Sequence, residues 1–163
     1  MNKINTKNMK KLIVLFVASL SLTLVSAQTL DFSGNWKLNT ALSKLNAEFS
    51  FAPAEIIIVQ KGNDMNVEKH SNWQGEDFTI TDKFTLDGKE CINTGFQDTQ
   101  KKSTTAWSED KKSLIITSKL VMGDGNEMTI TETYSTEGKN LVLISKASSS
   151  YGDVEETMVY EKK

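Results

Sequence analysis

The chain beyond Pro53 consists of short runs in which apolar and polar side chains alternate. The run 78–86 shows this best, with an apolar face made of Phe78, Ile80, Phe84 and Leu86. A period of two is the spacing of a β-strand with one buried face, because successive side chains point to opposite sides of the sheet. We therefore predict nine strands after Pro53, at residues 55–61, 65–73, 78–86, 90–96, 102–108, 114–122, 128–135, 141–148 and 154–162.

Tight turns connect these strands, and Asp87-Gly88 is the clearest hairpin signal. Turn signals recur about every 11 to 14 residues, which is typical of antiparallel neighbours joined by short loops. No helical stretch is long enough for a parallel crossover, so a parallel sheet is excluded. With a first strand at Trp36, we predict an all-β fold, an antiparallel up-and-down β-barrel of about ten strands. A β-sandwich and an eight-stranded barrel are the alternatives, but a closed barrel leaves no edge strand exposed.

One short helix is expected after the first strand, in the segment 39–51. Its apolar residues recur at helical spacing, at Leu42, Leu45 and Phe49. Asn39 and Thr40 are both suitable capping residues, and Pro53 would end the helix because the residue before a proline disfavours α geometry. The alternative is an irregular loop with apolar anchors.

The stretch 32–38 places a glycine two residues before a tryptophan at the start of an apolar strand. Gly34 would allow a close approach of the backbone, and the indole of Trp36 would then fill the floor of a barrel. The alternative is a tryptophan in the core of any β protein. We expect Trp36 to be buried beside a lysine of the last strand, Lys162 or Lys163, with the cation over the indole.

The first 27 residues are predicted to be a secretory signal peptide, followed by one barrel domain at residues 28–163. Four lysines precede an apolar run of 14 residues, Leu12 to Val25, and Val25-Ser26-Ala27 has the small residues that signal peptidase requires. The cleavage point has no cysteine that could carry the lipid anchor of a bacterial lipoprotein. We therefore expect an exported protein, periplasmic or extracellular, without membrane insertion after cleavage.

The charge of the domain argues against polyanionic partners. Four of the 19 basic residues lie in the leader and all 21 acidic residues lie beyond it, so the domain has a net charge of −6. Nucleic acid and anionic membranes are therefore poor partners. Every basic residue is a lysine, so the usual bidentate ligand for carboxylates, arginine, is absent.

Residues suited to catalysis or metal binding are scarce. Cys91 is the only cysteine and His70 the only histidine, and no nucleophile elbow, histidine pair or Cys-x-x-Cys motif is present. We predict no internal disulfide, no metal, no cofactor and no enzymatic activity. His70 lies between polar residues and is expected at the surface.

Three stretches carry a family resemblance. The residues 32–38 resemble the opening of lipocalins and fatty-acid-binding proteins, the calycin barrels. The residues 157–162 are similar to the last strand of the fatty-acid-binding group, and 138–143 to its penultimate hairpin. The resemblance spans nearly all of the domain and implies a barrel whose internal cavity carries a small lipophilic molecule.

Two departures from that group affect the ligand. The group closes its entrance with two helices, whereas 39–51 has room for one. Its ligand carboxylate is held by inward arginines and a tyrosine on the last strand; the matching last-strand positions here are Met158 and Tyr160, and Glu132 lies near the position of the other arginine. The resemblance therefore carries over the barrel and does not carry over a fatty-acid ligand.

Alternation places two acids, Asp82 and Glu132, on otherwise apolar faces. An unpaired buried carboxylate is costly, so each needs a partner, protonation or cavity water. A bulge could turn each side chain outward, or it could form an internal pair with a tyrosine or lysine. Otherwise the pocket is predicted to be lined by Asp82, Trp107, Glu132, Tyr134, Met158 and Tyr160. Trp107 is an aromatic wall or a plain core residue.

These observations favour a secreted protein that binds a small lipophilic molecule, neutral or cationic, in a barrel cavity. The alternative is a protein-interaction or protease-inhibitor module that uses the barrel as a scaffold, which a solidly packed interior would favour. An enzyme is a third and weaker interpretation. A monomer is the expected oligomeric state.

Overall fold

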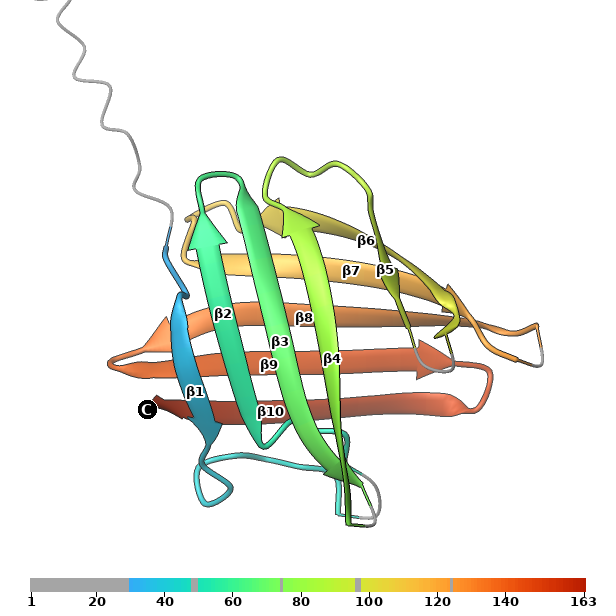
Figure 1. Cartoon of the computed structure of the whole chain (residues 1–163), viewed down its shortest axis with the longest axis horizontal. Helices are drawn as coiled ribbons and strands as arrows, with labels where there is room; N and C mark the ends of the chain where they lie inside the picture. Colours follow the sequence, from blue (N-terminus) through green and yellow to red (C-terminus); the bar gives the residue numbers. More distant parts are fainter. Residues whose placement is uncertain (1–29, 48–49, 74, 96–97, 124) are drawn as a thin grey trace, which may run out of the picture.

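The computed structural model describes residues 30–47, 50–73, 75–95, 98–123 and 125–163. These residues form ten strands in one antiparallel sheet, which confirms the predicted up-and-down β-barrel. The strands are β1 (Gly34–Leu38), β2 (Glu55–Lys61), β3 (Asp64–Trp73), β4 (Glu76–Thr85), β5 (Cys91–Thr94), β6 (Gln100–Trp107), β7 (Ser113–Val121), β8 (Glu127–Glu137), β9 (Asn140–Ser149) and β10 (Gly152–Lys162). Figure 1 shows β1 to β4 crossing β7 to β10 at a steep angle, so that the two halves of the sheet enclose the interior.

The first strand joins the beginning and the end of the sheet. The strand order is β4-β3-β2-β1-β10-β9-β8-β7-β6-β5, so β1 is paired with both β2 and β10. Trp36 stands opposite Ile56 on one side and Lys162 on the other. Beyond the ladder, the N–H of Lys163 donates to Asn35 O at 2.8 Å. Every other ladder joins strands that follow one another in the chain.

The two outer strands of the sheet, β4 and β5, meet without a ladder, and we call this junction the seam. Side chains connect it. Asn93 of β5 hydrogen-bonds the backbone N–H and C=O of Lys83 on β4, at 2.8 and 3.0 Å. The N–H of Thr85 donates to Cys91 Sγ at 3.2 Å, and Thr105 Oγ1 of β6 donates to Thr85 O at 2.6 Å. Between its two outer strands the barrel is therefore closed by side-chain contacts.

The helix expected at 39–51 is wrong: the described part of this segment, 39–47 and 50–51, contains no helical residue. Asn39 begins a turn instead, because its Oδ1 accepts hydrogen bonds from the N–H groups of Ala41 and Leu42. The backbone then pairs with β10, where Lys44 and Thr157 exchange two hydrogen bonds of 2.7 and 2.9 Å. The ladder between β10 and β1 covers only the end of β10, so the preceding backbone groups of β10 remain available to this segment. The segment takes its hydrogen-bond partners from β10, whereas a short helix would have to form them within itself.

The core lies between the two halves of the sheet. Its buried apolar residues are Phe32, Trp36, Ile56, Ile58, Met65, Val67, Phe84, Leu114, Ile116, Tyr134, Leu141, Leu143, Met158 and Tyr160. The alternate burial along β2 and β7 follows the predicted period of two. No helix among the described residues is long and apolar enough to cross a membrane.

One residue of the predicted inward face departs from it. Phe78 was expected beside Phe84 in the interior but is 41% exposed. It pairs with Ser71 near the tip of the β3–β4 hairpin, whereas β2 pairs with β3 only as far as His70. The hairpin therefore extends past its neighbouring strand, and Phe78 lies on the part that this strand does not flank.

Candidate functional site

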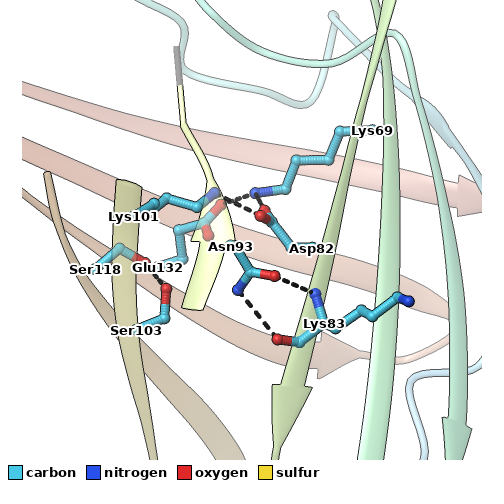
Figure 2. Close-up of polar contacts among 8 residues, drawn as sticks. All are labelled: Lys69, Asp82, Lys83, Asn93, Lys101, Ser103, Ser118 and Glu132. Carbon is cyan, nitrogen blue, oxygen red and sulfur yellow. Dashed lines mark hydrogen bonds and ion pairs between the residues drawn. The ribbon is translucent and has the colours of Figure 1, made fainter. Parts of the chain in front are cut away.

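Four charged side chains from four strands meet inside the barrel, and Figure 2 shows how they point toward one another. We call them the charged quartet: Lys69 of β3, Asp82 of β4, Lys101 of β6 and Glu132 of β8. Each lies in phase with the buried residues of its own strand, so the alternation that builds the sheet also turns these charges inward.

Two lysines and two carboxylates alternate in the quartet. Lys69 Nζ lies 2.5 Å from Glu132 Oε1 and 3.8 Å from Asp82 Oδ2. Lys101 Nζ lies 2.6 Å from Asp82 Oδ1. The Asp82 side chain is fully buried, and the other three side chains are 10–13% exposed. The formal charges cancel, which a low-dielectric interior requires of buried ions.

Lys69 is the central member of the quartet because it contacts both acids. Burial by itself would lower the pKa of Lys69, but the charge of Glu132, followed by Tyr134 and Asp82, outweighs burial and raises this pKa above its ordinary value. Lys69 therefore carries its positive charge throughout the neutral range.

Two tyrosines lie close to the quartet and differ in how their hydroxyl groups are bonded. Burial raises the pKa of both Tyr134 and Tyr160, and the charge of Glu132 raises that of Tyr134 further. Tyr160 Oη donates to Pro53 O at 3.1 Å and lies 3.4 Å from Met158 Sδ. Tyr134 Oη, by contrast, is buried without a hydrogen-bond partner among the described residues.

Asp82 also has unused hydrogen-bonding capacity. Although Lys101 approaches one of its oxygens to 2.6 Å, neither carboxylate oxygen accepts a hydrogen bond of proper geometry from the described residues. The ion pair neutralises the charge of Asp82 and engages its Oδ1, which leaves Oδ2, at 3.8 Å from Lys69 Nζ, as the open acceptor. Buried polar atoms in proteins nearly always have a hydrogen-bond partner, so Asp82 and Tyr134 are exceptions that need a reason.

The other buried polar groups on the same side of the barrel bond to each other. Ser103 Oγ of β6 and Ser118 Oγ of β7 lie 2.8 Å apart, as Figure 2 shows. Thr105 is committed to the seam through its bond to Thr85 O. One side of the interior is therefore polar, and its open bonding positions are concentrated at Asp82 and Tyr134.

Aromatic rings form the boundary of this polar region. Trp107 is half-buried and stacks on Phe32, with ring centroids 6.1 Å apart and planes inclined by 11°. Phe32 in turn packs against Tyr134 at 6.1 Å and a tilt of 55°. Trp107 is thus part of the apolar packing of the barrel, and Phe32 lies between it and Tyr134.

The surroundings of Trp36 match part of the prediction made for it, and its place at the floor of the barrel stays a prediction. Trp36 is buried, its Nε1–H donates to Phe32 O at 2.9 Å, and Lys162 Nζ lies 5.4 Å from the centroid of its indole. The prediction that a last-strand lysine covers Trp36 is confirmed for Lys162, whereas Lys163 pairs with Glu55 at 2.7 Å. Gly34 has a φ of 154°, and a Cβ there would come within 2.9 Å of Lys162 Cε. Glycine therefore suits this close crossing.

Sequence reasoning found the acids of the quartet and missed its lysines. The alternative that each acid has an internal lysine partner describes the structure: Glu132 pairs with Lys69, and Asp82 with Lys101 and Lys69. The alternation along each strand could have found these lysines. Lys69 is two residues from the buried Val67, and Lys101 is two residues from the buried Ser103, so both lie on the inward face of their strands. Among the described residues, no group of three His, Cys, Asp or Glu side chains could hold a metal ion.

A second feature lies on the outer side of the seam. An open groove of about 410 Å³ is lined by Asp64, Asn66, Lys83, Phe84, Thr85, Glu90, Cys91 and Ile92. Phe84, which belongs to the core, is the one buried apolar residue in this lining. Asp82 lies two residues from Phe84 on the same face of β4.

Comparison with solved structures shows where this fold occurs. Zebrafish ileal bile acid-binding protein complexed with cholic acid is similar, with a TM-score of 0.56 and 18% identity, over 81% of this chain and 98% of that one. The REP1-NXSQ fatty acid transporter has a TM-score of 0.56 and 16% identity, over 80% of this chain and 95% of that one. Apo lipid binding protein 8 of Caenorhabditis elegans has a TM-score of 0.52 and 13% identity, over 81% and 95%.

At these identities the likeness establishes a shared fold, the antiparallel β-barrel that the resemblance of the sequence had implied. These neighbours are binding and transport proteins. No protein-family model and no curated protein matches the sequence.

Proposed function

We propose that this protein binds a small lipophilic molecule inside its β-barrel. The observation that carries the proposal is a buried polar region with open bonding positions, at Asp82 and Tyr134, within an otherwise apolar interior. Binding sites for small molecules combine apolar walls with a few placed polar groups in this way. The bile acid-binding and fatty acid-transporting proteins that share the fold support the same class of ligand.

The sequence predicted a neutral or cationic ligand, and we propose an uncharged one rather than a free fatty acid, because the acids of the quartet are paired as well as its lysines. The chain has no arginine, and Met158 stands where the resembling group places one. Both lysines that point inward, Lys69 and Lys101, are already paired with acids. A ligand carboxylate would therefore find no uncompensated positive charge in the quartet.

The positions of the only histidine and the only cysteine favour binding over catalysis. His70 is turned outward from β3, where it contacts Glu68 at 2.8 Å and Thr79 at 3.0 Å. Cys91 is part of the seam, with its sulfur bonded by Thr85. Neither contacts the quartet in these bonds. We also propose that the protein acts outside the cytoplasm, on the basis of the predicted leader at residues 1–27.

Titration with an uncharged, polarity-sensitive dye such as Nile red tests the proposal. We expect saturable binding, displacement by lipophilic molecules, and a copurifying molecule that native mass spectrometry and solvent extraction identify. Ile116→Phe, which fills the buried interior, should weaken the dye, whereas Ile92→Phe on the exposed surface should not. A dye signal without saturation, together with a native mass equal to the chain alone, would overturn the proposal.

A further inference from the structure

We propose that Asp82 and Tyr134 form a binding site for the hydroxyl head of an uncharged lipophilic alcohol. This inference rests on the proposed function of the barrel as a lipophile carrier and names the chemical class of its ligand. It starts from two buried atoms of the described interior that have no close hydrogen-bond partner, Asp82 Oδ2 and the Tyr134 hydroxyl.

The two groups are complementary to a single hydroxyl. The Asp82 oxygens can only accept hydrogen bonds while the carboxylate is ionised, and the phenol of Tyr134 can donate one. Both are 0% exposed, so bulk water does not satisfy them. A ligand hydroxyl that donates to Asp82 and accepts from Tyr134 would give both groups a hydrogen-bond partner. A hydrocarbon can do neither, and a ligand oxygen without a hydrogen can only accept.

The two groups belong to the same small region of the barrel. Tyr134 follows Glu132 on the inward face of β8, and Lys69 connects Glu132 to Asp82 through contacts of 2.5 and 3.8 Å. The charges of Lys69 and Asp82 both act on the pKa of Tyr134, in opposite directions. The proposed head group would therefore lie beside Lys69, between Asp82 and Tyr134.

The charge of the quartet selects an uncharged head. Its two lysines and two acids cancel, and each charge has its partner within the quartet. A ligand carboxylate would add a third negative charge beside Asp82 and Glu132. An ammonium would add a third positive charge beside Lys69 and Lys101. Both would be buried without a counter-ion, and an alcohol carries no such cost.

The surroundings suit an apolar tail on such a head. The ring of Tyr134 packs against Phe32, which continues the apolar lining to Trp107. Asp82 itself is followed two residues later on the inward face of β4 by the buried Phe84. The proposed head site therefore has apolar core residues on both sides.

The test uses dodecanol, dodecanoic acid and dodecylamine, which share one tail, as competitors of Nile red at neutral pH. We expect the wild type to bind the alcohol about tenfold more tightly than the acid or the amine, a ratio equivalent to one well-made hydrogen bond. Tyr134→Phe should abolish most of this preference, because it removes the phenolic O–H that the oxygen of the alcohol would accept from.

Tyr160→Phe is the matched control, because its hydroxyl is already bonded to Pro53 O. It should lower thermal stability and keep the preference for the alcohol. If the dye binds but the three ligands compete equally, or if the acid binds best, the alcohol site is overturned while the lipophile-binding function stands. If Tyr134→Phe keeps the full preference for the alcohol, Tyr134 is excluded from the site. If neither dye nor ligand binds saturably, the proposed function itself is overturned.

Discussion

Asn93 forms with Lys83 the same two hydrogen bonds that a neighbouring strand would form. Its Nδ2 donates to Lys83 O at 3.0 Å, and its Oδ1 accepts from Lys83 N at 2.8 Å, as Figure 2 shows. Paired residues of an antiparallel ladder exchange an N–H···O bond in each direction. At the seam, one side-chain amide thus takes the place of one pair in the missing ladder.

Replacing this amide should loosen the seam. Asn93→Ala removes both bonds, and we expect it to destabilise the protein by about 1–2 kcal/mol and to accelerate hydrogen exchange at the Lys83 amide. Asn93→Asp is the control, since it keeps the acceptor for Lys83 N and loses the donor to Lys83 O. Unchanged exchange at Lys83 in the alanine variant would mean that the amide does not hold the seam.

Removing Lys101 should leave a buried carboxylate without its nearest cation. Lys101→Met is expected to cost about 3 kcal/mol in denaturant unfolding, because breaking a buried pair on one side is far more costly than replacing both partners. The neighbouring Lys102 is exposed, so Lys102→Met is the matched control. Equal effects of the two substitutions would contradict the pairing of Lys101 with Asp82.

Alkaline titration should distinguish the three tyrosines. Tyr151 is 73% exposed, whereas burial raises the pKa of Tyr134 and Tyr160 above their ordinary value of 10.0. The unfolded chain loses those two protons above pH 10 and the folded chain retains them. Stability is therefore full below pH 10 and falls as the pH rises, by about 1.4 kcal/mol per tyrosine per pH unit. The raised pKa of Lys69 acts in the same direction.

Absorbance at the tyrosinate band measures this directly. Tyr134 and Tyr160 should ionise only together with the loss of circular dichroism. Tyr151→Phe removes the exposed tyrosine, so that the absorbance change of this variant reports Tyr134 and Tyr160 alone. Reversible ionisation of that variant in its folded state would refute the buried positions of the two tyrosines.

The stability of the protein should depend much more on the indole of Trp36 than on the cation that Lys162 places over it. Trp36→Ala is expected to cost about 3–5 kcal/mol, as for other buried aromatic residues. Lys162→Met should cost roughly 0.5–1 kcal/mol, since it keeps the aliphatic contact and loses the cation. Urea unfolding compares the two, and a loss below about 1 kcal/mol for Trp36→Ala would be typical of a surface residue instead.

The leader remains a prediction, since residues 1–29 lie outside the described part of the chain. Expression with export should release a protein that begins at Gln28, because Val25-Ser26-Ala27 fits the requirement of signal peptidase. The intact mass of the exported protein decides this. A mass that retains residues 1–27 would show that the segment is not a cleaved leader.

The ten strands were predictable because each one carries its own evidence. A period of two with turn residues at both ends is local information, and the observed bounds of the strands after Pro53 differ from the expected ones by no more than two residues. The segment 39–47 was mispredicted because its backbone partners, Thr157 and Val159, lie on β10. Asp82 and Glu132 were found because an acid interrupts an apolar row. Lys69 and Lys101 were missed because a lysine among polar neighbours resembles a surface residue, and the partner of each lies on another strand.

The strand order of the sheet has a consequence for the connectivity of the molecule. Read from the seam, the sheet runs β5 to β10 and then β1 to β4, so a circular permutant cut in the β4–β5 loop would have every ladder between consecutive strands. The join would fall where Lys163 already bonds to Asn35. The pairing of β1 with β10 is thus the one ladder of high contact order, and it delays barrel closure until the last strand has been made. In the permutant that same ladder becomes an ordinary hairpin. The β4–β5 loop is the only connection between consecutive described strands that joins no ladder, so the sheet can be formed without it.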